Sequence, residues 1–339
     1  MSRIKVAVIG CGAISQEHFR YLSSSELVDL AAVCDVSPSA GRYAVDRFGA
    51  SKAYTDVATM LTEVNPDAIH ILTPPGSHRA LVEQCLRADA HVICEKPITF
   101  TSAELMPLLA LAGERGRWLL ENHNYRFNDQ TIALDGYLSS GALGDVHSVD
   151  VVMSVPMPDS DLGAPAGAVH DYITHASYLA LHLLGDRDVD DVRARWRLTG
   201  PGRAARYDDL AALIGVGDSH ATIRISGVPR PMAFRIVVRG SKGAVETDMF
   251  QPYLRADLER GDAQLGPLVN HAANGFGLLK ATARNLGNKI LQKGAYHGLD
   301  RFLARFYEAL AAGGPPPISV AELVRTSRLI DALVAEATR

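Results

Sequence analysis

The segment IKVAVIGCGAIS, residues 4–15, determines how the first part of this chain is expected to fold. Its first six residues are mostly apolar and predict a buried strand, which runs directly into the spacing G-x-G-x-x-S. Gly10 permits a tight turn, Gly12 lets the backbone approach a pyrophosphate, and the free amides that open the following helix attract an anion. We therefore expect a dinucleotide to bind at Gly10, Gly12, Ala13 and Ile14.

Asp35 follows the second predicted strand, twenty residues after Ser15. Its carboxylate can accept hydrogen bonds from both hydroxyls of an adenosine ribose, and its charge repels a 2′-phosphate. We therefore expect NAD as the cofactor and regard NADP as less favoured. Arg42 lies near enough in the sequence to soften that preference. The alternative interpretation is a surface glycine turn beside a solvated aspartate.

Short strand-like runs alternate with helical stretches in the first third of the chain, which is the pattern of a parallel sheet covered by helices on both faces. Strands are expected at residues 4–9, 28–34, 68–72, 91–94 and 118–121. Helices are expected at residues 14–22, 57–63, 79–88 and 103–114. Pro107 predicts a kink or a late start in the last of these helices.

Longer strand-like runs with few helices between them follow residue 123, and they predict an antiparallel or mixed open sheet in a second domain. These runs cover residues 146–155, 189–198, 210–216, 220–226 and 232–239. The expected fold class is α/β: an N-terminal Rossmann domain with a doubly wound parallel sheet over residues 1–122, and a C-terminal α+β domain with an open, mainly antiparallel sheet over residues 123–339. Helices predicted at 299–311 and 320–335 close the chain, and their packing back onto the Rossmann domain is left open.

Composition excludes several classes of protein. The chain has 339 residues, 47% of them hydrophobic, which is enough for a sizeable core. Its 34 basic and 38 acidic residues give a net charge of −4, which argues against a nucleic-acid partner bound through bulk charge. The N-terminal apolar run is too short for a signal or membrane segment, so we expect a cytoplasmic protein without membrane association. The four cysteines have no C-x-x-C spacing and are expected to be reduced core residues.

Two motifs follow the third and fourth of these strands: TPPGSH at residues 73–78 and CEKP at residues 94–97. Open parallel sheets bind ligands at the carboxyl ends of their strands, so both motifs are placed for a role in binding. The cofactor contacts expected from them are Thr73, Pro74, His78, Glu95 and Lys96.

With these two motifs the chain resembles the Gfo/Idh/MocA family, named for glucose-fructose oxidoreductase, inositol dehydrogenase and a rhizopine-catabolism protein. The family carries a t-P-x-x-x-H loop and an E-K-P motif. Further similar segments are NYRF at 124–127, SGALGDV at 140–146, DYITH at 171–175 and RGSKG at 239–243. The resemblance covers nearly the whole chain, and it is weakest over residues 251–297.

The resemblance implies a catalytic group formed by Lys96, Asp171 and His175. Asp171 and His175 are four residues apart, so on a helix they share one face. His175 is expected to act as the base for a hydroxyl proton, because histidine titrates near neutral pH. Lys96 is expected to polarise the substrate oxygen, and Asp171 to orient the substrate or Lys96. The resemblance also implies a cis peptide bond before Pro97.

Substrate contacts are expected from Asn124, Tyr125 and Arg126, which follow the last Rossmann strand. A hinge stabilised by hydrogen bonds is an equally open interpretation of these residues. Ile173 stands where the family commonly has a glycine, and we expect it to narrow or reshape the pocket. No metal site is expected, because His170, His175 and His182 lack a carboxylate-rich ligand set.

The function that the resemblance implies is NAD(P)-dependent interconversion of a secondary hydroxyl and a ketone on a sugar, a cyclitol or a nucleotide-sugar. Two alternatives remain open: an NAD-assisted glycosidase or lyase without net redox, and a non-catalytic dinucleotide-binding regulator. The expected partners are a small-molecule sugar or cyclitol and further copies of the chain, in a homodimer or homotetramer that covers the open face of the second sheet.

Two basic surfaces are also evident in the sequence. Arg193, Arg195 and Arg197 alternate along a predicted strand and project from one sheet face, for which a solvated or subunit-contact role is favoured over an anionic ligand. Residues 275–291 form a predicted helix with one apolar side. Its basic side carries Lys280, Arg284, Lys289 and Lys293. Docking on its own domain or on a second subunit is favoured over a membrane surface.

Overall fold

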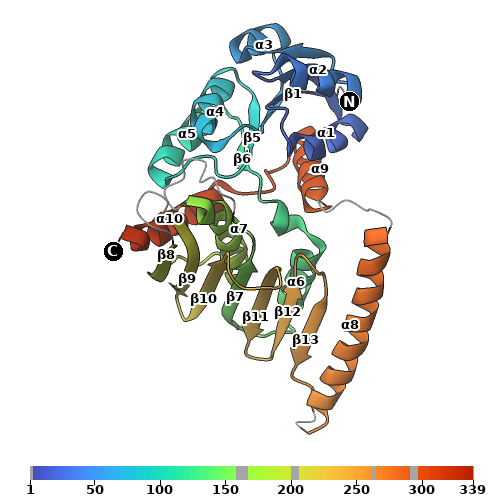
Figure 1. Cartoon of the computed structure of the whole chain (residues 1–339), viewed down its shortest axis with the longest axis vertical. Coiled ribbons are helices and arrows are strands. Elements are labelled where there is room, and N and C mark those ends of the chain that lie inside the picture. The colour runs from blue at the N-terminus through green and yellow to red at the C-terminus, as the bar shows by residue number, and fades with distance from the viewer. Residues whose placement is uncertain (1–2, 158–166, 200–205, 262–263, 291–296, 339) are drawn as a thin grey trace. The chain divides into compact units, whose positions relative to one another are not determined.

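The chain forms two compact units in a computed structural model that describes residues 3–157, 167–199, 206–261, 264–290 and 297–338 (Figure 1). Unit 1 contains Met1–Asn124 and Gly298–Ser327, and unit 2 contains Tyr125–His297 and Arg328–Arg339. The last two helices, α9 (His297–Ala312) and α10 (Val320–Ala335), are therefore shared out: nearly all of α9 and the first half of α10 belong to unit 1.

Unit 1 is built on a six-stranded parallel sheet in the order β3-β2-β1-β4-β5-β6, which confirms the expected doubly wound fold. The strands are β1 (Ile4–Ile9), β2 (Val28–Cys34), β3 (Lys52–Tyr54), β4 (Ala68–Ile71), β5 (His91–Cys94) and β6 (Leu119–Glu121). The strand order reverses between β1 and β4, which pair with each other. This switch point is where an open α/β sheet leaves room for a ligand.

Three helices of unit 1 begin at side-chain caps. Ser37, Asp56 and Thr101 each accept a hydrogen bond from a backbone N–H in the first turn of α2 (Pro38–Phe48), α3 (Val57–Val64) and α5 (Ser102–Glu114), respectively. The other helices that unit 1 contains before α9 are α1 (Ser15–Ser24) and α4 (His78–Arg87). The late start expected for α5 is wrong: the Thr101 cap starts the helix at Ser102, and Pro107 lies within it.

Helix α9 completes the core of unit 1 from a distant part of the sequence. Phe302, Phe306 and Tyr307 are fully buried. The ring of Phe306 meets the ring of Trp118, next to β6, edge to face at 5.6 Å. The apolar side of this amphipathic helix thus packs against the Rossmann sheet's own residues.

Unit 2 is built on a seven-stranded sheet in the order β13-β12-β11-β7-β10-β9-β8. Its strands are β7 (Val146–Ser154), β8 (Asp191–Thr199), β9 (Arg206–Val216), β10 (Ser219–Ser226), β11 (Ala233–Gly240), β12 (Gly243–Asp248) and β13 (Leu254–Leu258). β7 and β10 pair in parallel and the other neighbours pair antiparallel, which confirms the mainly antiparallel sheet.

Helix α7 (Gly167–Leu184) covers one face of this sheet. Alternate strand residues such as Val151 and Ile223 point to that face and pack in one core with Leu179 of α7 and Leu333 at the end of α10. Their neighbours in the strands point to the opposite face. η2 (Asn124–Phe127) and α6 (Asp129–Ser139) lead from β6 to β7.

Helix α8 (Gly266–Ile290) lies along the edge strand β13 (Figure 1). Asn274 binds the backbone of Ala256 with both its amide oxygen (2.9 Å) and its amide nitrogen (3.2 Å), and Asn270 donates to Leu258 O at 2.8 Å. These side chains satisfy an edge that would otherwise be open to pairing. The helix begins nine residues before the predicted segment, and Lys293 lies outside the described residues. None of the helices in the described ranges is both long and apolar enough to cross a membrane.

Candidate functional site

The glycine loop after β1 is shaped by close backbone packing. Gly10 has a φ of 94°, and a Cβ at this position would stand 2.8 Å from the carbonyl carbon and oxygen of Leu72, which follows β4. Only glycine fits there without displacing the backbone. Gly12, in contrast, is exposed, and nothing lies within 4 Å of the place its Cβ would take. The loop is therefore rigid at Gly10 and open at Gly12.

The N-terminus of α1 is available to an anion. Ile14 is its N-cap residue and no side chain caps the helix, in contrast to α2, α3 and α5. The Ser15 hydroxyl instead donates to Gly12 O at 2.6 Å, which holds the turn in shape. Uncapped amides beside an open glycine fit a pyrophosphate.

Asp35 ties the glycine loop to the end of β2. One carboxylate oxygen accepts a hydrogen bond from Cys11 N and the other from Ser37 N, each at 2.7 Å. Each carboxylate oxygen can accept more than one hydrogen bond, so the half-buried group retains capacity for ribose hydroxyls. Arg42 is exposed on α2. Taken with the open glycine and the uncapped helix, these residues fit the adenosine and pyrophosphate of NAD.

His78 braces the loop at residues 73–78 against the E-K-P turn. Its buried ring nitrogens lie 2.7 Å from Thr73 O and 2.8 Å from Pro97 O. His78 is expected to contact the cofactor, but both of its ring nitrogens lie against backbone carbonyl oxygens. Its side chain therefore supports the two segments. Thr73 Oγ1 bonds Ser77 Oγ at 2.7 Å, and Pro74 is exposed.

The turn that carries Lys96 is held on several sides. Glu121, at the end of β6, accepts a hydrogen bond from Ile98 N at 2.8 Å, and Asn122 donates to the Glu95 carboxylate at 2.6 Å. His123 donates to the second oxygen of Glu121 at 2.8 Å. The Lys96–Pro97 bond is cis, as the resemblance implies. The turn is therefore held in place on both sides of Lys96, at Glu95 and at Ile98.

Glu95 is an anion within this arrangement. Burial by itself raises the pKa of this carboxyl group, but the hydrogen bond from His18, with the Asn122 amide and the Lys96 charge, lowers the pKa below its ordinary value. His18, Glu121 and Asn122 support the turn that carries Lys96, and the sequence patterns did not single them out. The strand order would have placed the β6 end beside the E-K-P turn, since β5 and β6 pair.

In unit 2, Asp171 and His175 lie one turn apart on α7. His175 is 9% exposed, its Nδ1 lies 3.0 Å from the Tyr178 hydroxyl, and its ring meets that of Tyr125 edge to face at 4.8 Å. Tyr178 also accepts a hydrogen bond from Tyr125 N at 3.2 Å. Tyr178 thus connects His175 to the Tyr125 backbone. Lys96 belongs to unit 1, whereas Asp171 and His175 belong to unit 2.

Ile173, which stands where the family commonly has a glycine, packs in the core of unit 2. Ile173 is fully buried and belongs to the hydrophobic cluster that includes Val151 and Phe234. Two residues along a helix point to nearly opposite sides, so Ile173 and His175 diverge. Ile173 therefore faces the core of unit 2 rather than the side of α7 that carries His175, and its expected effect of narrowing or reshaping the pocket stays a prediction.

Arg126 has a structural partner. Its Nε donates to His182 Nδ1 at 3.2 Å, and His182 Nε2 donates to Asp135 at 2.8 Å, so the group joins η2, α7 and α6. Asn124 is the last residue of the first segment of unit 1, and Tyr125 begins unit 2. Within the residues that the structure describes, no three His, Cys, Asp or Glu side chains gather as a metal site would require.

Two family models match this chain. One, described as an oxidoreductase family with an NAD-binding Rossmann fold, matches residues 4–123, and the other, the GFO/IDH/MocA C-terminal domain, matches residues 132–246. The chain belongs to the Gfo/Idh/MocA family. It is accordingly an NAD-binding oxidoreductase. The second match ends before residues 251–297, where the Gfo/Idh/MocA resemblance is weakest.

Individual Gfo/Idh/MocA relatives are distant. Inositol 2-dehydrogenase of Rhizobium meliloti is 25% identical over 270 residues, which cover 78% of this chain and 81% of the relative. D-apiose dehydrogenase of Paraburkholderia graminis is 33% identical over 144 residues, 42% of this chain and 38% of the relative. The structure of the WlbA dehydrogenase from Bordetella pertussis, solved with NADH and UDP-GlcNAcA, has a TM-score of 0.81 at 20% identity and covers 99% of this chain and 96% of that one.

Proposed function

We propose that this protein is an NAD-dependent dehydrogenase that interconverts a secondary hydroxyl and a ketone on a sugar, a cyclitol or a nucleotide-linked sugar. The observation that carries the proposal is the immobilised E-K-P turn, because Glu121, Asn122 and His78 all hold the backbone around Lys96. A lysine fixed in this way, at the sheet edge that also carries the glycine loop, is suited to bind a developing alkoxide.

The cofactor is assigned to the edge of the Rossmann sheet. The backbone at Gly12, Ala13 and Ile14 would hold the pyrophosphate of the cofactor, and Asp35 would hold its adenosine ribose. Thr73, Pro74 and Glu95 would line the path to the nicotinamide. When bound, the nicotinamide accepts or donates a hydride at C4.

The proton chemistry is assigned to unit 2. If His175 Nδ1–H donates to the Tyr178 hydroxyl, then Nε2 carries the lone pair that removes the substrate's hydroxyl proton. The Lys96 ammonium polarises the oxygen, and Asp171 orients the substrate or Lys96 through its carboxylate. In the reducing direction His175 returns the proton. Asn124 and Tyr125 are proposed as substrate contacts, and Arg126 mainly as the support of η2.

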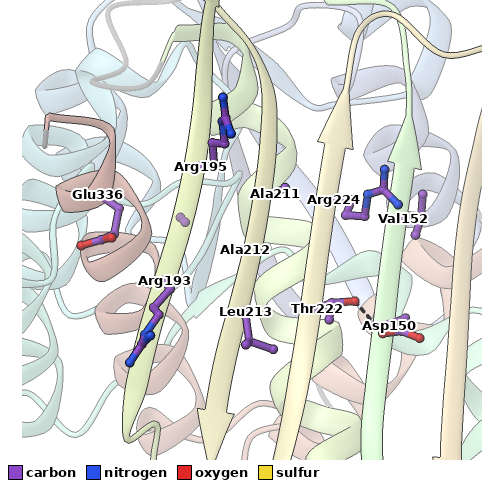
Figure 2. A pocket seen from close by; sticks show the side chains of 11 residues that line it. Asp150, Val152, Arg193, Arg195, Ala211, Ala212, Leu213, Thr222, Arg224 and Glu336 are labelled. Carbon is purple, nitrogen blue, oxygen red and sulfur yellow. Dashed lines mark hydrogen bonds between the residues drawn. The ribbon is translucent and has the colours of Figure 1, made fainter.

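A homodimer or homotetramer is proposed on two surfaces of unit 2. The sheet face opposite α7 carries a shallow pocket of about 770 Å³. Figure 2 shows Arg193, Leu213 and Arg224 on this face, with the hydrogen bond between Thr222 and Asp150. Leu213 is 49% exposed there. Mixed charges around exposed apolar residues suit a contact with a second copy.

Helix α8 adds an exposed apolar stripe. Leu268, Phe276, Leu279, Leu286 and Ile290 are all exposed, and they recur at helical spacing on the side away from β13. A row of exposed apolar side chains on a folded protein is typical of a contact surface. We assign this stripe to the same assembly.

The experiment that tests the function is a thermal-shift titration with NAD+, NADH, NADP+ and NADPH, after release and assay of any cofactor retained through purification. A ligand at about a hundred times its Kd stabilises the fold by roughly 2.7 kcal/mol. We expect a shift with the NAD forms, followed by reduction of NAD+ at 340 nm with one class of sugar or cyclitol. Substrate cleavage without net NADH would instead indicate the redox-neutral lyase or glycosidase. NAD binding with no turnover of any polyol would indicate the regulator.

A further inference from the structure

A chain of buried hydrogen bonds runs through unit 1 to Glu95. His18 Nε2 lies 3.3 Å from Glu95 Oε1, His18 Nδ1 lies 2.8 Å from His70 Nδ1, and His70 Nε2 lies 2.6 Å from the Tyr307 hydroxyl. His18, His70 and Tyr307 are each fully buried, and they come from α1, β4 and α9. The bond between His18 and Glu95 has been described above, but none of the roles assigned so far uses His70 or Tyr307.

One direction of these hydrogen bonds leaves every buried polar hydrogen of the series with an acceptor. Among the described residues, His70 Nε2 is the sole hydrogen-bond partner of the Tyr307 hydroxyl, so the buried phenol donates its proton to that nitrogen. His70 must then carry its proton on Nδ1 and donate it to His18 Nδ1. His18 in turn carries its proton on Nε2 and donates it to the Glu95 carboxylate, which only accepts.

Burial supports this direction. It raises the pKa of the Tyr307 hydroxyl well above its ordinary value, so the phenol remains a donor. Burial lowers the pKa of His70 well below its ordinary value, so His70 is neutral and has one N–H to give. The series satisfies each buried nitrogen with no more than one proton apiece.

We propose that Tyr307, His70 and His18 are positioning residues, whose one-directional chain of hydrogen bonds holds the Glu95 carboxylate as an oriented anion in the turn that carries Lys96. Asn122 donates to the same oxygen, Oε1, so the second oxygen of Glu95 is left for a donor from the cofactor or from Lys96. The catalytic meaning of this arrangement rests on the proposed function, but the direction of the chain does not.

Three variants separate positioning from mere packing. Tyr307→Phe removes one hydroxyl and keeps the ring. His18→Leu removes the donor to Glu95, whereas His18→Gln keeps an amide N–H at a comparable reach. Tyr21→Phe is the matched control, because the Tyr21 ring stacks on that of Tyr307 at 6.1 Å while its hydroxyl is outside the chain.

Kinetics in NAD and substrate provide the first readout. His18→Leu loses the hydrogen bond to the buried Glu95 carboxylate, and Tyr307→Phe loses the phenol that fixes the His70 tautomer, so each should lower kcat/KM for NAD about tenfold. Each should also raise the pKa of Glu95, so the acid side of the pH profile moves to higher pH. His18→Gln should restore both, and Tyr21→Phe should leave both unchanged. Equal losses in His18→Leu and His18→Gln, with an unmoved acid limb, would overturn the proposal.

Other titratable groups near Glu95 could also move the acid limb of the pH profile. They are His18 on α1, Lys96 in the turn, and Cys94 and Glu121 at the ends of β5 and β6. All four residues are retained in Tyr307→Phe, so a shift of the acid limb in that variant is due to the broken chain of hydrogen bonds.

Nitrogen NMR of the wild-type protein tests the chain without any reaction. We expect His70 as the Nδ1–H tautomer and His18 as the Nε2–H tautomer, both retained in the Tyr21→Phe control. A His70 Nε2–H tautomer, or a doubly protonated His18, would refute the chain even if the enzyme is active. An inactive protein with the expected tautomers would refute the proposed function and leave the chain intact.

Discussion

The carboxylate of Asp35 accepts a hydrogen bond from the backbone N–H of Cys11 at 2.7 Å. The residue assigned to the ribose therefore also fixes the glycine loop to the end of β2. A change at this position has two separable effects, one on the shape of the loop and one on the charge that a 2′-phosphate would meet.

Asp35→Ala should weaken NAD more than NADP, because it removes both the ribose acceptor and the repulsive charge. Asp35→Asn is the matched variant: its amide oxygen can still accept from Cys11 N, but the charge is gone. Dissociation constants for NADH and NADPH, measured by fluorescence titration, should show the NADH preference reduced in both variants. An unchanged ratio of the two constants would show that Asp35 does not read the ribose.

Removing the Glu121 carboxylate, which accepts a hydrogen bond from Ile98 N, should disturb the position of Lys96. Glu121→Ala leaves a buried N–H and the His123 ring without their carboxylate, which should lower the free energy of unfolding by about 1–3 kcal/mol and reduce kcat more than it weakens NAD. Glu121→Gln keeps an acceptor for Ile98 N and should lie between. Urea unfolding and kcat measured on the same preparations test this; a stable Glu121→Ala protein with full kcat would contradict it.

Lys96→Ala and His175→Ala should each retain NAD binding and lose turnover about a hundredfold or more, the general size of acid–base contributions. Tyr178→Phe removes the partner of His175 Nδ1 and should cost less, since the ring of His175 still packs on Tyr125. Stopped-flow hydride transfer compared with NADH titration gives both quantities. Wild-type rates in His175→Ala would end its assignment as the base.

Acid should destabilise unit 1 partly through His91. Burial, with the charge of Arg117, lowers the pKa of His91 to about 4 against an opposing effect of Asp67, and its Nδ1 accepts a hydrogen bond from Trp118 N. Unfolded histidine binds its proton below about pH 6.5, whereas folded His91 does so only near pH 4. Between these values the unfolded state binds more protons, so the free energy of unfolding decreases as the pH is lowered. His91→Asn should show a smaller fall in urea unfolding over that window. Parallel curves for the two proteins would exclude His91 as a source.

Charges placed on the two proposed contact surfaces should dissociate the assembly. Leu213→Glu introduces a carboxylate on the open sheet face, and Phe276→Glu does so on α8. Both side chains are exposed, so thermal unfolding of the isolated chain should change little. Light scattering after size exclusion should show a smaller species for at least one variant. If the wild-type protein is already monomeric, the assembly itself is refuted.

Much of the cofactor edge was predictable because its signals are local. The glycine spacing after β1 and the E-K-P motif after β5 lie within a few residues of their strands, and period and turn chemistry suffice to place them. β3 escaped prediction because three residues, Lys52–Tyr54, are too few to show a period. The fate of Ile173 needed the structure, since only the packed sheet decides which side of α7 is core.

The supports of the site were beyond reach for a different reason. Tyr307 meets His70 across 237 residues of sequence, and Glu95 meets His18 across 77. Nothing in the local pattern of either residue records such a partner. A buried histidine has many possible neighbours, and only the order of strands and the docking of α9 select among them.

The place of α9 also bears on how the protein is made. Unit 1 acquires Phe302, Phe306 and Tyr307 from a segment that leaves the ribosome only after all of β7 to β13 has been synthesised. During translation the nascent Rossmann sheet therefore exposes the apolar surface around Trp118, and His70 has no phenol to bind. A fragment that ends at Asn124 carries the whole glycine loop and all six strands of the Rossmann sheet, yet it should be aggregation-prone when expressed alone. Supplying the segment Gly298–Ser327 in trans should rescue its solubility.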